Sequence, residues 1–337
     1  MTAKAQGAAI FGCEGSVLGK AEAAFFRDFD PLGFIIFARN VESPEQLRRL
    51  TADLRNAIGR DAMILVDQEG GRVQRLRAPH WREWPTPIEM VESAGQLAAP
   101  AMALRSRIIA KELRAVGIDA NCAPVADIAS ALTHPFLRNR CYAEDAARVA
   151  EIATAVAAGH LAEGILPVIK HMPGHGRSTV DTHLDLPKVT ASRADLLDTD
   201  FAPFAALADL PMAMTAHIIF TAFDAINPAT QSRPMITMIR EDIGFKGLLL
   251  TDDLNMEALS GGLGERTARS LQAGCDIALH CKGDLAQMIE VATAAGPMRP
   301  ESVLRADSAL ARRGSVSDAS TEALDAELHA LLSETSS

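Results

Sequence analysis

The sequence of 337 residues predicts a (β/α)8 barrel, also called a TIM barrel, built as a single domain. Eight short apolar runs have the length of buried strands, and stretches with helical periodicity separate most of them. Polar residues directly follow several of these runs. Strands that alternate with helices pair in parallel, and eight such units are typical of a barrel. An open, doubly wound sheet is the structural alternative.

The predicted strands are apolar runs of four or five residues. In chain order they are Ala8–Phe11, Gly33–Phe37, Met63–Val66, Asp119–Ala123, Leu166–Lys170, Met212–Ala216, Leu248–Thr251 and Asp276–His280.

Helix signals lie between these runs. Ser43 followed by Pro44 is a typical helix start, because Ser caps the amino end and Pro suits the first helical position. Apolar residues then repeat at helical spacing as far as Ile58. A second helix is predicted over residues 96–116. A third runs from Asp145 to Glu163 and ends before Gly164, a residue that often terminates helices.

The barrel domain is predicted to cover residues 1–315. Residues 316–337 form a polar, acidic tail in which four leucines are spaced for a terminal helix, at positions 324, 328, 331 and 332.

Composition narrows the class of protein. Hydrophobic residues make up 48% and charged residues 23%, which is ordinary for a soluble globular protein. A net charge of −10 argues against a nucleic acid partner. The run Ala8–Phe11 is too short for a signal-peptide core, and no run approaches the roughly 18 apolar residues of a membrane span. Five cysteines without a C-x-x-C pair indicate reduced thiols. We therefore expect a cytoplasmic protein.

The segment from Lys170 to His183, KHMPGHGRSTVDTH, concentrates chemically active residues. It holds three histidines, and its two glycines and one proline indicate a loop. The loop leaves a predicted buried strand at its carboxyl end, where α/β folds place their active sites. From the residues alone, a catalytic loop, a metal site and an ordinary surface loop are all possible.

The pattern Lys-His-x-Pro-Gly-His-Gly, followed after four residues by Asp-x-His, resembles the signature loop of the β-N-acetylhexosaminidases of glycoside hydrolase family 3. Three further phrases are similar to motifs of that family and occur in its order: VDQEGGRVQR at residues 66–75, Arg140-x-Tyr142, and TDDLNM at residues 251–256. The resemblance spans about residues 7–300. Small departures are Met172 for Phe, Thr182 for Ser, and TDDLNM for SDDLSM.

The resemblance implies a catalytic set. Asp252 would be the nucleophile, and His183 would be the general acid and base, oriented by Asp181. The residue types suit these roles, since an imidazole with a pKa of about 6.5 exchanges protons near neutrality. Strand alternation would point Asp252 and Asp253 in opposite directions, so only one of them should face the pocket.

The resemblance also implies the groups that bind the sugar, namely Asp67, Arg75, Arg140, Lys170 and His171. It assigns Asp127 a structural role behind these groups. We expect His217, after the sixth predicted strand, to line the pocket without a catalytic role.

The resulting hypothesis is a retaining exo-β-N-acetylglucosaminidase that acts on anhydro-muropeptides during cell-wall recycling. It would be a monomer that binds a small carbohydrate and needs no cofactor or metal. Alternatives are a β-glucosidase or phosphorolytic enzyme of the same family, a metal-dependent barrel hydrolase that uses His171, His175 and His183, and a catalytically silent sugar-binding protein.

Overall fold

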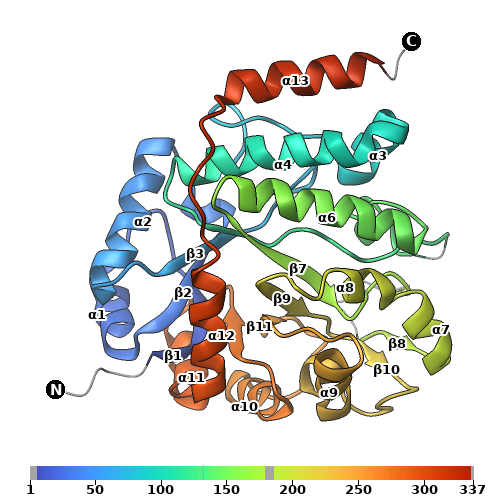
Figure 1. The fold of residues 1–337 in the computed structure, drawn as a ribbon. Helices are drawn as coiled ribbons and strands as arrows, with labels where there is room; N and C mark the ends of the chain where they lie inside the picture. The colour runs from blue at the N-terminus through green and yellow to red at the C-terminus, as the bar shows by residue number, and fades with distance from the viewer. Residues whose placement is uncertain (1–5, 132, 179–185, 335–337) are drawn as a thin grey trace.

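The computed structural model describes residues 6–131, 133–178 and 186–334, and it confirms the predicted barrel (Figure 1). Eight strands close in the order β1-β12-β11-β9-β7-β6-β3-β2, and every neighbouring pair is parallel. Apart from this closure, neighbours in the barrel follow the chain order. The barrel strands are β1 (Gly7–Gly12), β2 (Pro31–Ile36), β3 (Met63–Val66), β6 (Ala120–Asn121), β7 (Leu166–Met172), β9 (Met212–Thr215), β11 (Leu248–Asp253) and β12 (Ile277–His280).

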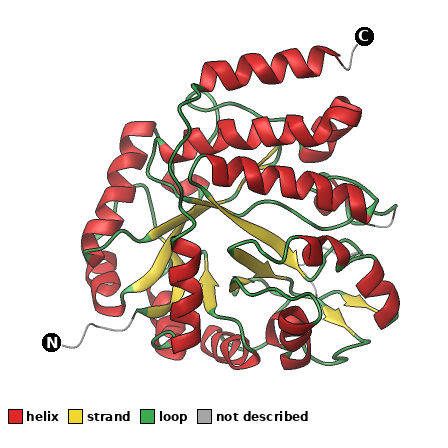
Figure 2. Ribbon diagram, viewed as in Figure 1, coloured by secondary structure: helices red, strands yellow, loops and turns green. Residues whose placement is uncertain are grey.

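Helices surround the barrel, and short strand pairs lie outside it (Figure 2). The helices are α1 (Lys20–Phe29), α2 (Pro44–Ile58), α3 (Pro87–Ala94), α4 (Ala98–Arg114), α5 (Pro135–Arg138), α6 (Ala146–Ala162), α7 (Arg193–Asp198), α8 (Ala202–Ala206), α9 (Arg233–Glu241), α10 (Leu263–Ala273), α11 (Leu285–Ala295), α12 (Pro300–Leu310) and α13 (Thr321–Glu334). Three 3-10 turns are η1 (Ala38–Asn40), η2 (Gly95–Leu97) and η3 (Ala229–Gln231). Outside the barrel, β4 (Gln68–Gly70) pairs with β5 (Val73–Gln74), and β8 (Lys188–Val189) pairs with β10 (Ile219–Phe220).

The predicted helix starts have the expected capping contacts. The Ser43 side chain accepts a hydrogen bond from the Gln46 N–H at the start of α2. The Asp145 side chain accepts one from the Arg148 N–H at the start of α6. These side chains satisfy backbone donors that the first helical turn leaves without partners. Gly164, just beyond α6, has a φ of +72°, a conformation that favours glycine.

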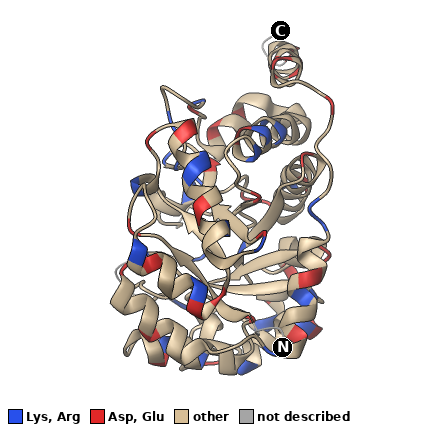
Figure 3. Cartoon of the chain, turned by 90° about the vertical axis from the view of Figure 1, so that its left-hand side faces the viewer, with Lys and Arg blue, Asp and Glu red and all other residues tan. Residues whose placement is uncertain are grey.

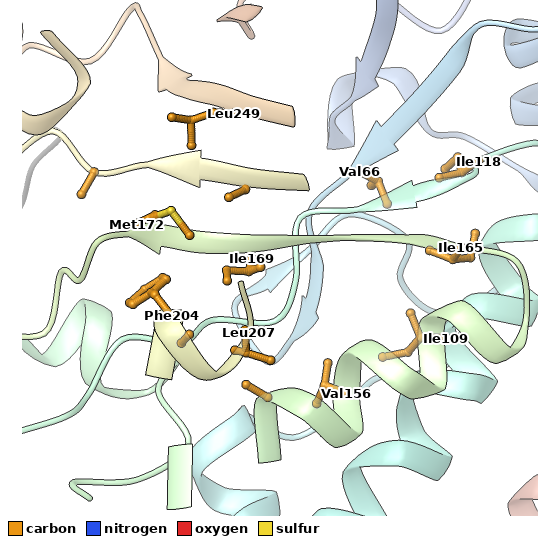
Figure 4. Close-up of a cluster of buried hydrophobic side chains, with 14 of the residues drawn as sticks. Val66, Ile109, Ile118, Val156, Ile165, Ile169, Met172, Phe204, Leu207 and Leu249 are labelled. Carbon is orange, nitrogen blue, oxygen red and sulfur yellow. The ribbon is translucent and has the colours of Figure 1, made fainter. Parts of the chain in front are cut away.

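Each barrel strand is buried on both faces, which explains why the strands read as continuous apolar runs. On β1, Ala8 and Ile10 point into the barrel interior, whereas Ala9 and Phe11 pack in the layer between the barrel and the helices. Figure 4 shows that outer layer around β7, where Ile169 lies near side chains from α6 and α8.

The surface carries charges of both signs. In Figure 3, Lys and Arg are interspersed with Asp and Glu along the helices that face the viewer. Helix α13 packs on α4, and Asp325 of α13 forms an ion pair of 2.6 Å with Arg82. The predicted division at residue 315 falls in the connection between α12 and α13.

Among the helices of the described residues, none combines the length and the apolar character that a membrane crossing requires.

Candidate active site

A cavity of about 170 Å³ lies at the carboxyl ends of the barrel strands, the face at which TIM-barrel enzymes build their active sites. Asp67 directly follows β3, His171 is the penultimate residue of β7, and Asp252 the penultimate residue of β11. The lining residues are Ile35, Phe37, Asp67, Val73, Arg75, His134, Phe136, Leu137, Arg140, Lys170, His171, His175, Met214, Asp252, Asp253, Met256, Leu279 and Cys281. The structure thus brings together the described residues predicted to be the nucleophile and the sugar-binding groups, namely Asp252, Asp67, Arg75, Arg140, Lys170 and His171.

Lys170 joins two carboxylates at this cavity. Its Nζ lies 2.8 Å from Oδ1 of Asp67 and 2.6 Å from Oε1 of Glu69. Burial alone would raise the pKa of the Asp67 carboxyl, but Lys170, Arg75 and Arg140 outweigh burial and hold that pKa below its usual range. Burial would lower the pKa of Lys170, but Asp67 and Glu69 raise it overall. All three groups are therefore charged at neutral pH.

Arg140 forms a second ion pair with Glu69, in addition to that of Lys170. Its Nε and Nη2 atoms donate to Oε2 and Oε1 of Glu69, both at 2.9 Å, in a bidentate pair. Burial opposes the charge on Glu69, but Arg140 and Lys170 hold the pKa of its carboxyl below the ordinary value. The two parallel hydrogen bonds fix the relative position of these groups. Removing either group would leave the other as a buried charge without its partner.

Arg75 is the third cation that lines the cavity, after Lys170 and Arg140. Its Nη2 lies 3.1 Å from Oδ2 of Asp67, and its backbone N–H donates to Oε1 of Gln68 at 2.8 Å. The Nε atom of Arg75 is buried and has no hydrogen-bond partner. Together with Lys170 and Arg140, Arg75 provides three cations against the carboxylates of Asp67 and Glu69. Fixed donors and acceptors of this kind suit the hydroxyl groups of a neutral, polyhydroxylated ligand.

His171 is held in one orientation. Its Nδ1 lies 2.7 Å from Oδ2 of Asp127, and its Nε2 lies 3.3 Å from Nη2 of Arg140. Because a guanidinium can only donate, Nε2 is the acceptor in this contact and Nδ1 donates to Asp127. Oδ1 of Asp127 accepts the backbone N–H groups of His171 and His175. Asp127 is completely buried and does not line the cavity, in keeping with the structural role predicted for it.

Asp252 presents its carboxylate to the cavity. Its Oδ1 accepts the Asp253 N–H at 2.8 Å. Burial would raise the pKa of the Asp252 carboxyl, but His171, His217, the Asp253 N–H and Lys170 together lower it. An ionised carboxylate beside fixed hydrogen-bond donors is the arrangement that attack on a sugar would require.

Comparison of the whole sequence with known protein families gives a match. The family model described as the glycosyl hydrolase family 3 N terminal domain matches residues 22–328. The chain belongs to glycosyl hydrolase family 3.

Curated relatives and solved structures of family 3 enzymes resemble the chain over most of its length. A beta-hexosaminidase of Methylococcus capsulatus is 37% identical over 253 residues, which is 74% of this chain and 75% of the relative. One of Bordetella avium is 38% identical over 263 residues, covering 75% of each protein. The structure of NagZ from Neisseria gonorrhoeae in complex with N-trifluoroacetyl-D-glucosamine has a TM-score of 0.83 and 29% identity. The match covers 98% of this chain and 97% of that one.

One detail of this family 3 site differs from the sequence prediction. Both Asp252 and Asp253 line the cavity, although strand alternation would allow only one to face it. The pairing of β11 with β12 shifts register between Leu250 and Asp253, so regular alternation does not extend to the strand end. Oδ1 of Asp253 accepts the N–H groups of Asn255 and Cys281, each at 3.1 Å. Asp253 therefore ties the end of β11 to the residue after β12.

The prediction that His217 lines the pocket is wrong. His217 is buried behind the cavity, where its Nδ1 lies 2.7 Å from Oγ1 of Thr230 and its Nε2 lies 3.1 Å from the carbonyl oxygen of Asp253. The imidazole makes these two hydrogen bonds within the protein, so it does not reach the cavity.

The predicted acid/base pair, Asp181 and His183, lies outside the described residues. Two other lining or supporting groups, Glu69 and His175, received no role in the glycosidase hypothesis. Glu69 was part of the quoted phrase VDQEGGRVQR but received no role, although three predicted cations against one carboxylate signalled a missing anion. His175 lines the cavity with a buried Nδ1 that has no partner, and burial lowers its pKa to about 4.

Of the described histidines of the metal-site alternative, His171 is engaged by a carboxylate, whereas Nδ1 of His175 has no hydrogen-bond partner. His171 is hydrogen-bonded to Asp127, as described above. Across residues 6–131, 133–178 and 186–334, no three His, Cys, Asp or Glu side chains are grouped as ligands of a metal ion.

Proposed function

We propose that this glycoside hydrolase, a β-N-acetylhexosaminidase, removes terminal β-linked N-acetylglucosamine with retention of configuration. The observation that carries the proposal is the ionised Asp252 in the same cavity as Asp67, Lys170 and Arg140, with Glu69 ion-paired to Lys170 and Arg140. This ion-paired cluster has fixed donors and acceptors for one sugar ring, and Asp252 adds an oxygen nucleophile. The relatives named beta-hexosaminidase support the sugar class.

In the proposed mechanism, Asp252 attacks the anomeric carbon while His183 donates a proton to the oxygen of the departing group. The bond between the anomeric carbon and that oxygen breaks, and a glycosyl ester forms on Asp252. His183 then removes a proton from water, which attacks the anomeric carbon and releases Asp252. Because Oδ1 of Asp252 accepts the Asp253 N–H, we assign the attack to Oδ2. Asp181 orients the imidazole of His183.

Asp67, Arg75, Arg140, Lys170 and His171 are proposed to hold the sugar. Asp67 would accept hydrogen bonds from sugar hydroxyls, whereas Arg75, Arg140 and Lys170 would donate them. A site built to hydrogen-bond a group rejects analogues that lack the group. The natural substrate is proposed to be N-acetylglucosamine linked to anhydro-N-acetylmuramyl peptides in cell-wall recycling. The enzyme would act as a monomer in the cytoplasm, where its five unpaired, buried cysteines would stay reduced.

The experiment compares aryl β-glycosides of N-acetylglucosamine and glucose as substrates. We expect the specificity constant to favour N-acetylglucosamine by at least about two orders of magnitude. Comparable rates on both would indicate a β-glucosidase. The same assay with added phosphate distinguishes hydrolysis, which gives the free sugar, from phosphorolysis, which gives the sugar phosphate. An EDTA arm tests the metal-dependent alternative, for which chelation would abolish activity.

A further inference from the structure

Arg72 is an exposed arginine near the cavity, and it has no role in the mechanism above. It lies at the tip of the β4–β5 hairpin, between Gly71 and Val73. Its guanidinium carbon is 3.3 Å from the centroid of the Phe136 ring, and Phe136 lines the cavity. Arg72 therefore lies where the enclosed sugar site meets solvent.

The backbone presents Arg72 rigidly. Gly70 and Gly71 both have positive φ, 103° and 58°, which a tight turn requires. The Gly71 N–H donates to the Trp84 carbonyl oxygen at 2.9 Å. The Arg77 guanidinium donates to the carbonyl oxygens of Gly71 and Arg72, at 2.8 and 3.3 Å. These contacts fix the backbone of the turn, and the Phe136 ring supports the guanidinium, so less entropy is lost when the side chain binds a ligand.

The guanidinium of Arg72 is stacked but has no acidic partner. Within the part of the chain that the structure describes, Arg72 forms no ion pair, whereas the nearby Arg75, Arg77 and Arg140 each pair with a carboxylate. Stacking on an aromatic ring leaves the edge of the guanidinium, with its N–H donors, free to bind an anion. The matching ligand for this planar fork is a carboxylate.

We propose that Arg72, supported by Phe136, binds a carboxylate on the leaving group of the substrate and makes the enzyme prefer acidic leaving groups. The inference rests on the proposed function, since it concerns the part of the glycoside that leaves. The cavity of about 170 Å³ takes up the sugar that is cut off, so the leaving group must extend over the rim. Its carboxylate could belong to the lactyl ether of a muramic acid or to an attached peptide.

The test compares three glycosides of N-acetylglucosamine. One has a muramic acid leaving group with a free lactyl carboxylate, and the second has the methyl ester of that acid. In the third, the lactyl group carries a peptide, so that the only carboxylates belong to the peptide. The measured quantity is the specificity constant, kcat/KM, of each acidic substrate divided by that of the ester.

We expect Arg72→Gln to lower this ratio about ten-fold, the lower end of the worth of a charge-assisted hydrogen bond. Arg72→Lys should keep part of the preference, and added salt should reduce it in the wild type. The control is Arg269→Gln on α10, which removes an exposed arginine paired with Glu265. If Arg72→Gln lowers the ratio for the lactyl acid, the bound carboxylate belongs to the muramic acid. If it lowers the ratio for the third substrate alone, the bound carboxylate belongs to the peptide.

An unchanged ratio in Arg72→Gln, or an equal fall in Arg269→Gln, would overturn the inference while leaving the proposed function intact. A wild-type enzyme that cleaves none of the three glycosides, nor the aryl glycoside of N-acetylglucosamine, would instead contradict the proposed function on which the inference rests.

Discussion

The imidazole of His171 and the carboxylate of Asp127 meet at 2.7 Å between Nδ1 and Oδ2, away from solvent. Asp127 is not in a barrel strand; it belongs to the connection that follows β6. Through this bond, a residue outside the cavity decides which nitrogen of His171 carries the hydrogen and which faces Arg140.

Replacing Asp127 with Asn tests this relationship. The amide oxygen can still accept backbone N–H groups, but its NH2 group would face Nδ1 and favour the other tautomer. Loss of one charge-assisted hydrogen bond predicts a fall in kcat/KM of about 10- to 100-fold. Thermal melting of the same samples checks folding. Full activity in a correctly folded Asp127→Asn enzyme would contradict the role given to this bond.

Asp252 provides the most direct test of the mechanism. A fluorinated slow substrate should leave a sugar attached to Asp252, detected by peptide mass. Asp252→Asn should keep its fold and lose at least about 10⁴-fold in kcat, since it removes the attacking group. Asp253→Asn is the matched control and should lose less, because the Asp253 carboxylate accepts hydrogen bonds from Asn255 and from the Cys281 N–H and is not the proposed nucleophile. A sugar on Asp253, or turnover without any adduct, would show that the nucleophile is wrongly assigned.

His183 should matter most for poor leaving groups. A sugar alkoxide needs a proton to depart, whereas a nitrophenolate leaves well without one. His183→Ala should therefore slow a disaccharide by about 10²–10⁴-fold and slow the first step of an activated aryl glycoside less. Asp181→Asn should give a milder version of the same pattern. Rates on aryl glycosides with a series of leaving-group pKa values provide the measurement, and an equal loss across the series would assign His183 to binding.

The ion-paired cluster predicts how stability depends on pH. The pKa values of the Asp67 and Glu69 carboxyls are lowered in the folded protein. Their contribution to the free energy of unfolding is therefore complete above the ordinary carboxyl pKa of about 4 and is lost as the pH falls through the lowered values. Glu69→Gln leaves Lys170 and Arg140 with a weaker partner, and we expect it to cost about 3–5 kcal/mol at pH 7.

Urea unfolding at pH 7 and at pH 3 measures this effect. The difference in stability between wild type and Glu69→Gln should shrink at pH 3, because Glu69 takes up a proton when the wild type unfolds below the ordinary carboxyl pKa. Glu92→Gln, an exposed position on α3, is the control and should change stability little at either pH. A constant difference at both pH values would mean that Glu69 stabilises the protein by packing rather than by charge.

Much of the architecture could be predicted from the sequence because the barrel strands are buried on both faces. The run Met63–Val66 has no polar residue on either face, and Leu248–Thr251 has only Thr251 at its end; each forms a strand of the barrel. The short pairs β4–β5 and β8–β10 were not predicted. They lie outside the barrel in polar or mixed segments, where neither alternation nor a continuous apolar run marks a strand.

The sequence led to candidate site residues, but not to the contacts among them. Asp67, Lys170 and Asp252 were named from the resemblance to the family motifs, and each lies near the end of a predicted strand. That Glu69 would bridge Lys170 and Arg140 depends on the approach of segments 71 and 101 residues apart, a distance in sequence that no local pattern records. The positions of Asp253 and His217 likewise depend on a register shift and on a bond to the Thr230 side chain.

The closing contact between β11 and β12 has a consequence for the timing of synthesis. The Cys281 N–H that supports Asp253, and β12 itself, which joins β11 to β1, are synthesised after all the other barrel strands. The sugar-binding side chains, from Asp67 to His171, are made much earlier. A growing chain can therefore carry every proposed sugar ligand and still be inactive, because the barrel stays open until β12 is in place.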